Sequence, residues 1–197
     1  GYSNHEDLRT LLNHLGVASA CLVGVSMGAS IALDFAVTYP ARTDALVAVG
    51  CGLPGWEWSD FLRSYWEREE ELLRRGDVAG AVEINIRTWV DGPNRTPDQV
   101  DPAVRERVRE MQAAIFARPE GVGEAEELGP PAIERLSGVT APALVVVGDQ
   151  DVSDIVAISE ALAAGIPGVR KVVMAGTAHL PNMERPDEFN RLVLDFV

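Results

Sequence analysis

Ser26 lies in a Gly-x-Ser-x-Gly pentapeptide that runs from Gly24 to Gly28. The apolar run Ala20–Val25 before it predicts a buried strand, and the alanine-rich segment Met27–Tyr39 after it predicts a helix. A serine at such a tight strand-to-helix turn is held in a strained conformation with its hydroxyl exposed, and flanking glycines remove Cβ atoms that would clash. The pattern predicts that Ser26 is a nucleophile. The alternative is an inert serine in an ordinary small-residue turn.

Three histidines are candidate bases for this serine. A serine hydroxyl is a poor nucleophile at neutral pH and needs a base that a third group orients. His5 and His14 belong to the first predicted helix, where a surface or packing role is expected. His179 instead follows the last predicted strand, Val169–Ala175, in a loop at the same edge as Ser26. His179 is therefore the predicted base.

The third group of the triad is expected in the turn after the preceding strand. That strand is predicted over Ala143–Gly148, and Asp149 and Asp151 follow it. Asp149 comes directly after the strand and can simply make the turn, while Asp154 has the place of a helix cap. Asp151 is therefore the predicted acid, and Asp149 is the alternative.

Strands that alternate with helices predict the α/β class with a parallel sheet. The remaining core elements are expected to be a helix over 4–15, a strand over 44–50, a helix over 152–164 and a closing helix over 185–197. Between 53 and 128 only helical periods occur, with helices near 58–75, 77–90 and 101–117 and loops at 91–94 and 120–123. We expect this insert to cover the carboxyl ends of the strands, where open α/β sheets place ligands.

The chain is strongly acidic, with a net charge of −13 and one lysine, Lys171. This charge repels phosphates and anionic lipids, so neither a nucleic acid nor a membrane is an expected partner. No apolar run reaches the ~18 residues that span a bilayer, and the first residues lack the pattern of a signal peptide. A cytoplasmic location is therefore expected. With 197 residues and 47% hydrophobic content, the chain can bury a substantial core.

The two cysteines, Cys21 and Cys51, are expected to be buried free thiols. Cys21 starts one predicted strand and Cys51 follows the end of the next, which places them too far apart for a disulfide. Metal and cofactor motifs such as His-Glu-x-x-His, Cys-x-x-Cys or a glycine-rich phosphate loop do not occur, so no cofactor is expected.

These motifs resemble the α/β-hydrolase superfamily in context and in the chain order serine, acid, histidine. Gly24–Gly28 resembles its nucleophile elbow, and Gly148–Asp151 its Gly-x-x-Asp acid turn. Ala178-His179, followed by Glu184-Arg185-Pro186, resembles its histidine loop. The nearest branch comprises lid-bearing esterases, enol-lactonases and cofactor-free perhydrolases. A serine nucleophile argues against the dehalogenases and most epoxide hydrolases of this fold, which use aspartate.

The resemblance also implies which part of the fold is present. The chain corresponds to strands five to eight of the usual eight, with core segments 1–52 and 129–197 and a helical lid, 53–128, between strands six and seven. The first strands, and the loop that supplies a second oxyanion amide, are then expected before residue 1. The Met27 backbone N–H is the expected oxyanion donor within this chain. The strand Ala20–Val25 is expected to form an open apolar edge through which the chain self-associates.

The expected activity is hydrolysis of a small-molecule ester or lactone through an acyl-enzyme. The same triad could instead serve perhydrolysis, acyl transfer or carbon–carbon bond hydrolysis. A third reading is a hydrolase-like binding module, or an inactive fragment. Trp56, Trp58 and Trp89 give the insert aromatic surface, part of which is expected to face the substrate.

Overall fold

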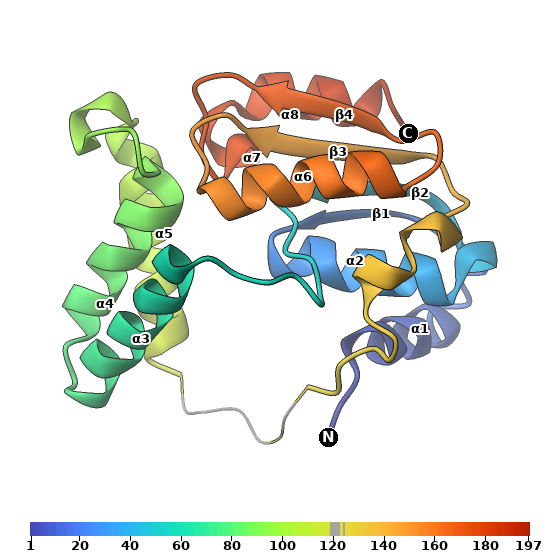
Figure 1. Ribbon diagram of the computed structural model, residues 1–197, viewed down its shortest axis with the longest axis horizontal. Helices are drawn as coiled ribbons and strands as arrows, with labels where there is room; N and C mark the ends of the chain where they lie inside the picture. Colours follow the sequence, from blue (N-terminus) through green and yellow to red (C-terminus); the bar gives the residue numbers. More distant parts are fainter. Residues whose placement is uncertain (119–122, 124) are drawn as a thin grey trace.

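Four parallel strands form a single sheet in a computed structural model that describes residues 1–118, 123 and 125–197 (Figure 1). The strand order is β1-β2-β3-β4, which is also the chain order. Their bounds are Ala20–Val25 (β1), Thr43–Val49 (β2), Ala143–Gly148 (β3) and Arg170–Met174 (β4). All four strands were predicted, and the parallel α/β architecture is confirmed.

Eight α-helices occur in the described ranges. Their bounds are Asn4–His14 (α1), Met27–Thr38 (α2), Asp60–Arg74 (α3), Val78–Asn85 (α4), Pro102–Phe116 (α5), Ser153–Gly165 (α6), Pro181–Glu184 (α7) and Pro186–Leu194 (α8). A π-helix continues α4 over Ile86–Asp91, and short 3₁₀ turns lie at Pro40–Arg42, Pro97–Gln99, Ala132–Glu134 and Leu136–Gly138. Among the described residues, no helix has the length and apolar character needed to cross a membrane.

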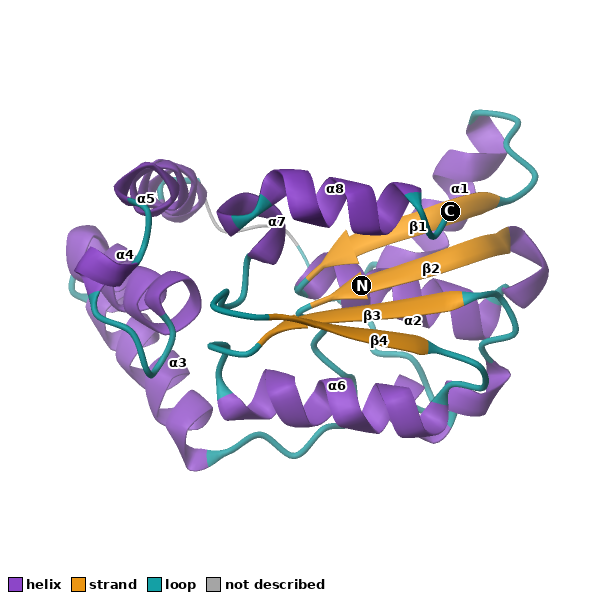
Figure 2. Cartoon of the chain, turned by 90° about the horizontal axis from the view of Figure 1, so that it is seen from above, coloured by secondary structure: helices purple, strands orange, loops and turns teal. Residues whose placement is uncertain are grey.

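The sheet is covered by helices on both faces (Figure 2). On one face, α2 and α6 pack against a row of strand residues that includes Leu46, Ala48 and Val145. On the other face, Phe189 of α8 packs against residues such as Val47. Alternate residues of β2 and β3 therefore point into two separate cores, which explains their unbroken apolar sequences. Burial of each large side chain in these cores contributes about 1.5–3 kcal/mol.

Strand β1 lies at an edge of the sheet and is only partly enclosed. Among the described residues it pairs only with β2, and Cys21 and Val23 are exposed on the α8 side of the sheet, Val23 by 50%. The prediction of two buried thiols is therefore wrong for Cys21, because α8 packs over β2 and β3 instead. Cys51 is buried, and this burial raises the pKa of its thiol to about 12.

Two predicted helices have bounds that differ clearly from the structure. The helix predicted over 77–90 changes to π geometry at Ile86. The closing helix ends at Leu194, short of the predicted Val197, and α7, which was not predicted, precedes it with its own proline at the first position. The first helix begins at Asn4, and the side chain of Ser3 before it makes no capping hydrogen bond. The loop predicted at 120–123 lies outside the described residues except for Gly123.

Helices α3, α4 and α5 follow β2 and precede β3, and we call them, with their connections, the helical insert. In Figure 1 the insert stands beyond the arrowheads of the strands, at their carboxyl ends. Asp154, expected to cap α6, instead joins the insert to the core. Its carboxylate accepts the Ser59 backbone N–H (2.8 Å) and hydroxyl (2.6 Å) at the start of α3.

Candidate active site

Ser26 occupies the turn between β1 and α2 in a strained conformation. Its φ is 54°, and no other non-glycine residue in the described part of the chain has a positive φ. Such a conformation is costly and persists only where the surrounding structure enforces it. The Ser26 backbone N–H donates to the Val49 carbonyl oxygen (2.8 Å), while the side chain makes no capping bond to α2. The hydroxyl is therefore free for another partner.

The two glycines of the pentapeptide have different roles. A Cβ on Gly24 would lie 2.3 Å from the Gly28 carbonyl oxygen, a distance that no side chain tolerates. A Cβ on Gly28 would meet nothing within 4 Å. The predicted crowding is therefore correct at Gly24 and wrong at Gly28, because only Gly24 faces the backbone of the next turn.

His179 and Asp151 form a buried pair at the same edge of the sheet. His179 Nδ1 lies 2.8 Å from Asp151 Oδ2, and the side chains are 6% and 0% exposed. The other carboxylate oxygen, Oδ1, accepts the Val152 backbone N–H at 2.8 Å. Since a carboxylate only accepts, Nδ1 carries the proton and Nε2 is left as an acceptor. This is the tautomer that a general base requires.

Asp149 points to a different partner. It is exposed, and its Oδ1 accepts the Gly176 backbone N–H (2.6 Å) and the Gln150 side-chain amide (3.1 Å). It thus connects the turn after β3 to the loop after β4, and it makes no hydrogen bond to His179. The structure brings Asp151, and not Asp149, to the histidine.

Ser26 and His179 line one cavity of about 270 Å³ beneath the insert. Its other lining residues are Asn85, Trp89, Val108, Met111, Gln112, Ile115, Leu180 and Met183. In the described structure no hydrogen bond joins the Ser26 hydroxyl to His179. Such bonds often tighten only when substrate binds. The lining is apolar apart from two amides and the two candidate catalytic side chains, and it contains no charged lysine, arginine, aspartate or glutamate.

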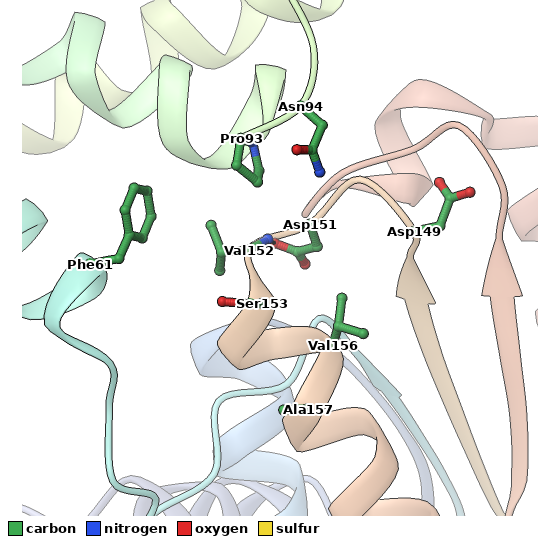
Figure 3. Close-up of a pocket in the computed structure, with 9 residues that line it drawn as sticks. All are labelled: Phe61, Pro93, Asn94, Asp149, Asp151, Val152, Ser153, Val156 and Ala157. Carbon is green, nitrogen blue, oxygen red and sulfur yellow. Dashed lines mark hydrogen bonds between the residues drawn. The ribbon is translucent and has the colours of Figure 1, made fainter.

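A larger cavity, of about 630 Å³, borders the other end of the candidate triad (Figure 3). It lies between Phe61 at the start of α3, Pro93 and Asn94 of the insert, and the first turns of α6. Asp151 lines it, but Ser26 and His179 do not. Neither the candidate nucleophile nor the candidate base lines this larger cavity, so the smaller cavity is the candidate active site.

The insert contacts the histidine directly, which the sequence patterns did not reveal. The His179 backbone N–H donates to the Trp89 carbonyl oxygen (3.2 Å), and the two ring centroids are 4.5 Å apart. Trp89 belongs to the π-helix, a distortion that is frequent at functional sites. Trp56 and Trp58 pack against the main core and do not line the Ser26 cavity.

The first turn of α2 begins directly after Ser26 and leaves the Met27 backbone N–H without a backbone acceptor among the described residues. A helix N-terminus favours negative charge, so this N–H suits an oxyanion next to Ser26. Within residues 1–118, 123 and 125–197, no group of three or more histidine, cysteine or acidic side chains could hold a metal ion.

Comparison with known proteins identifies the family to which this chain belongs. A family model described as "Alpha/beta hydrolase family" matches residues 1–192. The chain therefore belongs to the α/β-hydrolase family, as the motifs predicted. Among solved structures, an α/β-hydrolase enzyme from a Medee basin deep-sea metagenome library has a TM-score of 0.78 at 23% identity. The similarity covers 99% of this chain and 72% of that one.

Two curated relatives match almost the whole chain. A putative 2-succinyl-6-hydroxy-2,4-cyclohexadiene-1-carboxylate synthase of Bacillus subtilis is 25% identical over 98% of this chain and 70% of its own length. A 2-hydroxy-6-oxononadienedioate/2-hydroxy-6-oxononatrienedioate hydrolase of Paraburkholderia phymatum is 27% identical over 98% of this chain and 67% of its own. The chain thus spans about two thirds of the length of these relatives.

Proposed function

We propose that this protein is a serine hydrolase that cleaves a small, uncharged ester or lactone through Ser26, His179 and Asp151. The observation that carries the proposal is the strained Ser26 in the same cavity as a histidine whose Nδ1 is 2.8 Å from a buried carboxylate. Each of the three groups has the environment that its role requires. Membership of the α/β-hydrolase family supports the reaction class.

The chemistry follows from these positions. Ser26 Oγ adds to the substrate carbonyl carbon while His179 Nε2 takes the hydroxyl proton, and the Met27 N–H stabilises the oxyanion. The carbon–oxygen bond then breaks as the histidine returns the proton to the leaving alcohol, which forms the acyl-enzyme. Water repeats the two steps and releases the acid and free Ser26. Asp151 keeps the imidazole in the required tautomer and stabilises its charged form.

The lining of the cavity favours an uncharged substrate. A carboxylate that leaves water for an apolar site needs a cationic partner, and no arginine or lysine lines this cavity. Its amide groups, on Asn85 and Gln112, suit the polar atoms of an ester or lactone.

A second candidate is hydrolysis of a 2-hydroxy-6-oxo dienoic acid, which would break a carbon–carbon bond. The name of the relative from Paraburkholderia phymatum supports it. The substrate in that name is a dicarboxylate, which disagrees with the uncharged lining. Perhydrolysis and acyl transfer share the acyl-enzyme and differ only in the acceptor.

A fluorophosphonate probe tests the nucleophile, because it forms a covalent bond with an activated serine. Mass spectrometry should locate the label on Ser26, and Ser26→Ala should abolish labelling. Ser26→Ala and His179→Ala should each lower ester turnover by several orders of magnitude and leave a small residual rate. Ser153→Ala is the matched control, since Ser153 lines the larger cavity instead. Labelling that survives Ser26→Ala would contradict the proposal. A folded wild-type protein with neither label nor turnover would favour a non-catalytic binding module.

The substrate class is tested with two esters of similar length, 4-nitrophenyl pentanoate and 4-nitrophenyl hemisuccinate. We expect kcat/KM to favour the uncharged ester by at least about tenfold, since 1.4 kcal/mol of uncompensated desolvation is sufficient for that ratio. A preference for the hemisuccinate, or faster turnover of a 2-hydroxy-6-oxo dienoate, would favour the second candidate.

A further inference from the structure

Arg95 connects the insert to the loop that carries His179. Its side chain is only 9% exposed. Nε donates to the Asp91 carbonyl oxygen (2.8 Å) and Nη2 to that of Val90 (2.6 Å), both at the end of the π-helix. Nη1 donates to the Gly176 carbonyl oxygen (2.7 Å) and to Glu184 Oε2 (2.6 Å). One guanidinium therefore holds two segments that are more than 80 positions apart in the chain.

Glu184 extends this connection to the residue next to the histidine. Its side chain is 8% exposed, and its second oxygen, Oε1, accepts the Ala178 backbone N–H at 2.7 Å. The following N–H, that of His179, donates to the Trp89 carbonyl oxygen on the π-helix. The two consecutive backbone N–H groups of Ala178 and His179 thus donate to the two segments that Arg95 connects.

We propose that Arg95 and Glu184 are positioning residues. Through them, the position of the His179 side chain depends on how the helical insert packs against the core. The inference rests on the proposed function, in which His179 is the base. Neither side chain lines the Ser26 cavity, so neither can contact the substrate there. Their effect must pass through the histidine loop.

The arrangement requires this pair of side chains. A guanidinium presents five donors in a rigid, planar fork, which allows Arg95 to donate to three carbonyl oxygens and one carboxylate that lie in different directions. A lysine ammonium keeps the charge but lacks the fork. Without Arg95, the Glu184 carboxylate would be buried without its cation and would turn toward water, which would release the Ala178 N–H.

The experiment compares Glu184→Gln and Arg95→Lys in ester turnover. Glutamine keeps the shape of Glu184 but weakens the ion pair, and lysine keeps the charge of Arg95 without its fork. We expect kcat to fall about 10- to 100-fold, with KM within about twofold, because a misplaced base lowers the rate without changing the cavity. Arg109→Lys is the matched control, since Arg109 pairs with Glu83 inside the insert (2.9 Å) and should change neither parameter.

Two further measurements separate positioning from general stability. In a His179→Ala background, Arg95→Lys should have no additional effect on residual turnover, whereas a structural role would lower it again. By NMR, the hydrogen-bonded Nδ1 proton of His179, assigned by its loss in His179→Ala, should shift or broaden in Glu184→Gln and not in Arg109→Lys. An unchanged resonance with unchanged kcat in Glu184→Gln would overturn the inference. Full activity of His179→Ala would instead overturn the proposed function, and the NMR result would still decide the role of Glu184.

Discussion

At the scale of single residues, two aspartates in one turn have different tasks. Asp151 is buried against His179, whereas Asp149 is exposed and binds the backbone of the neighbouring loop. Both carboxylate oxygens of Asp151 have partners, the Val152 N–H and His179 Nδ1, which fits the orienting role that we propose for this residue.

Asp151→Asn should therefore lower ester kcat by about 10³- to 10⁴-fold, because an amide favours the wrong imidazole tautomer. Asp149→Asn should be mild, since an amide oxygen can still accept the Gly176 N–H. Steady-state kinetics on both variants, with circular dichroism as the folding control, gives the ranking. The reverse ranking would move the acid to Asp149.

At the scale of elements, the turn between β1 and α2 depends on the absence of a side chain at one glycine only. Gly24 is pressed against the first turn of α2, while the corresponding direction at Gly28 is open.

Gly24→Ala should lower the free energy of unfolding by at least about 1–3 kcal/mol, because the new Cβ overlaps backbone that cannot move freely. Gly28→Ala should be neutral or stabilise by up to about 1 kcal/mol, since alanine restricts the unfolded chain and fits a helix. Chemical denaturation of the two variants tests this contrast. Equal destabilisation would show that the turn is crowded on both sides.

Helix α2 also carries a poorly solvated acid on its inner side. Asp34 Oδ1 is buried and has no hydrogen-bond partner in the described structure. Burial raises the pKa of Asp34, and the nearby charges of His5 and Arg135 oppose this only in part. A folded pKa above the unfolded one means that the ionised carboxylate destabilises the fold at higher pH.

Asp34→Asn should therefore raise the melting temperature at neutral pH. The gain should shrink as the pH falls through the raised pKa of Asp34 and vanish below the unfolded value near ~3.9, where both states bind the proton. Thermal melts across this pH range, with the exposed Asp44→Asn as control, measure the effect. A gain that is independent of pH would show that ionisation of Asp34 is not its cause.

At the scale of the whole molecule, the sheet has two edge strands of different character. The outer strand β4 begins with Arg170 and Lys171, and such charges discourage strand pairing. Strand β1 has no charged residue and exposes Val23 and Cys21 on one face. Of the two edges, β1 is therefore the one suited to a second copy of this chain.

We predict that the 197-residue chain self-associates through β1. Val23→Lys should shift sedimentation velocity profiles toward the monomer, because it places a charge on the exposed face of the edge strand. Val173→Lys is the control, since Val173 is also 50% exposed but lies on β4. A wild-type chain that stays monomeric at high concentration would contradict this prediction.

The sequence by itself determined the parallel sheet, the order of its strands along the chain and the identity of Ser26, Asp151 and His179 as candidates. These features depend on short-range signals: apolar runs of strand length, a glycine pentapeptide between a strand and a helix, and polar residues directly after strands. Such signals extend over a few residues, so they can be recognised in the sequence without knowledge of the tertiary contacts.

Only the tertiary structure decided which groups meet. It showed that Asp151, and not Asp149, binds His179, and that Cys21 is exposed. It also showed that Trp89 and Arg95 of the insert contact the loop that carries His179. These contacts join residues that are far apart in the chain, and their geometry is set by how the insert packs against the ends of the strands. The local pattern around Arg95 is that of an ordinary polar loop, and its partners Gly176 and Glu184 come within reach only in the folded chain.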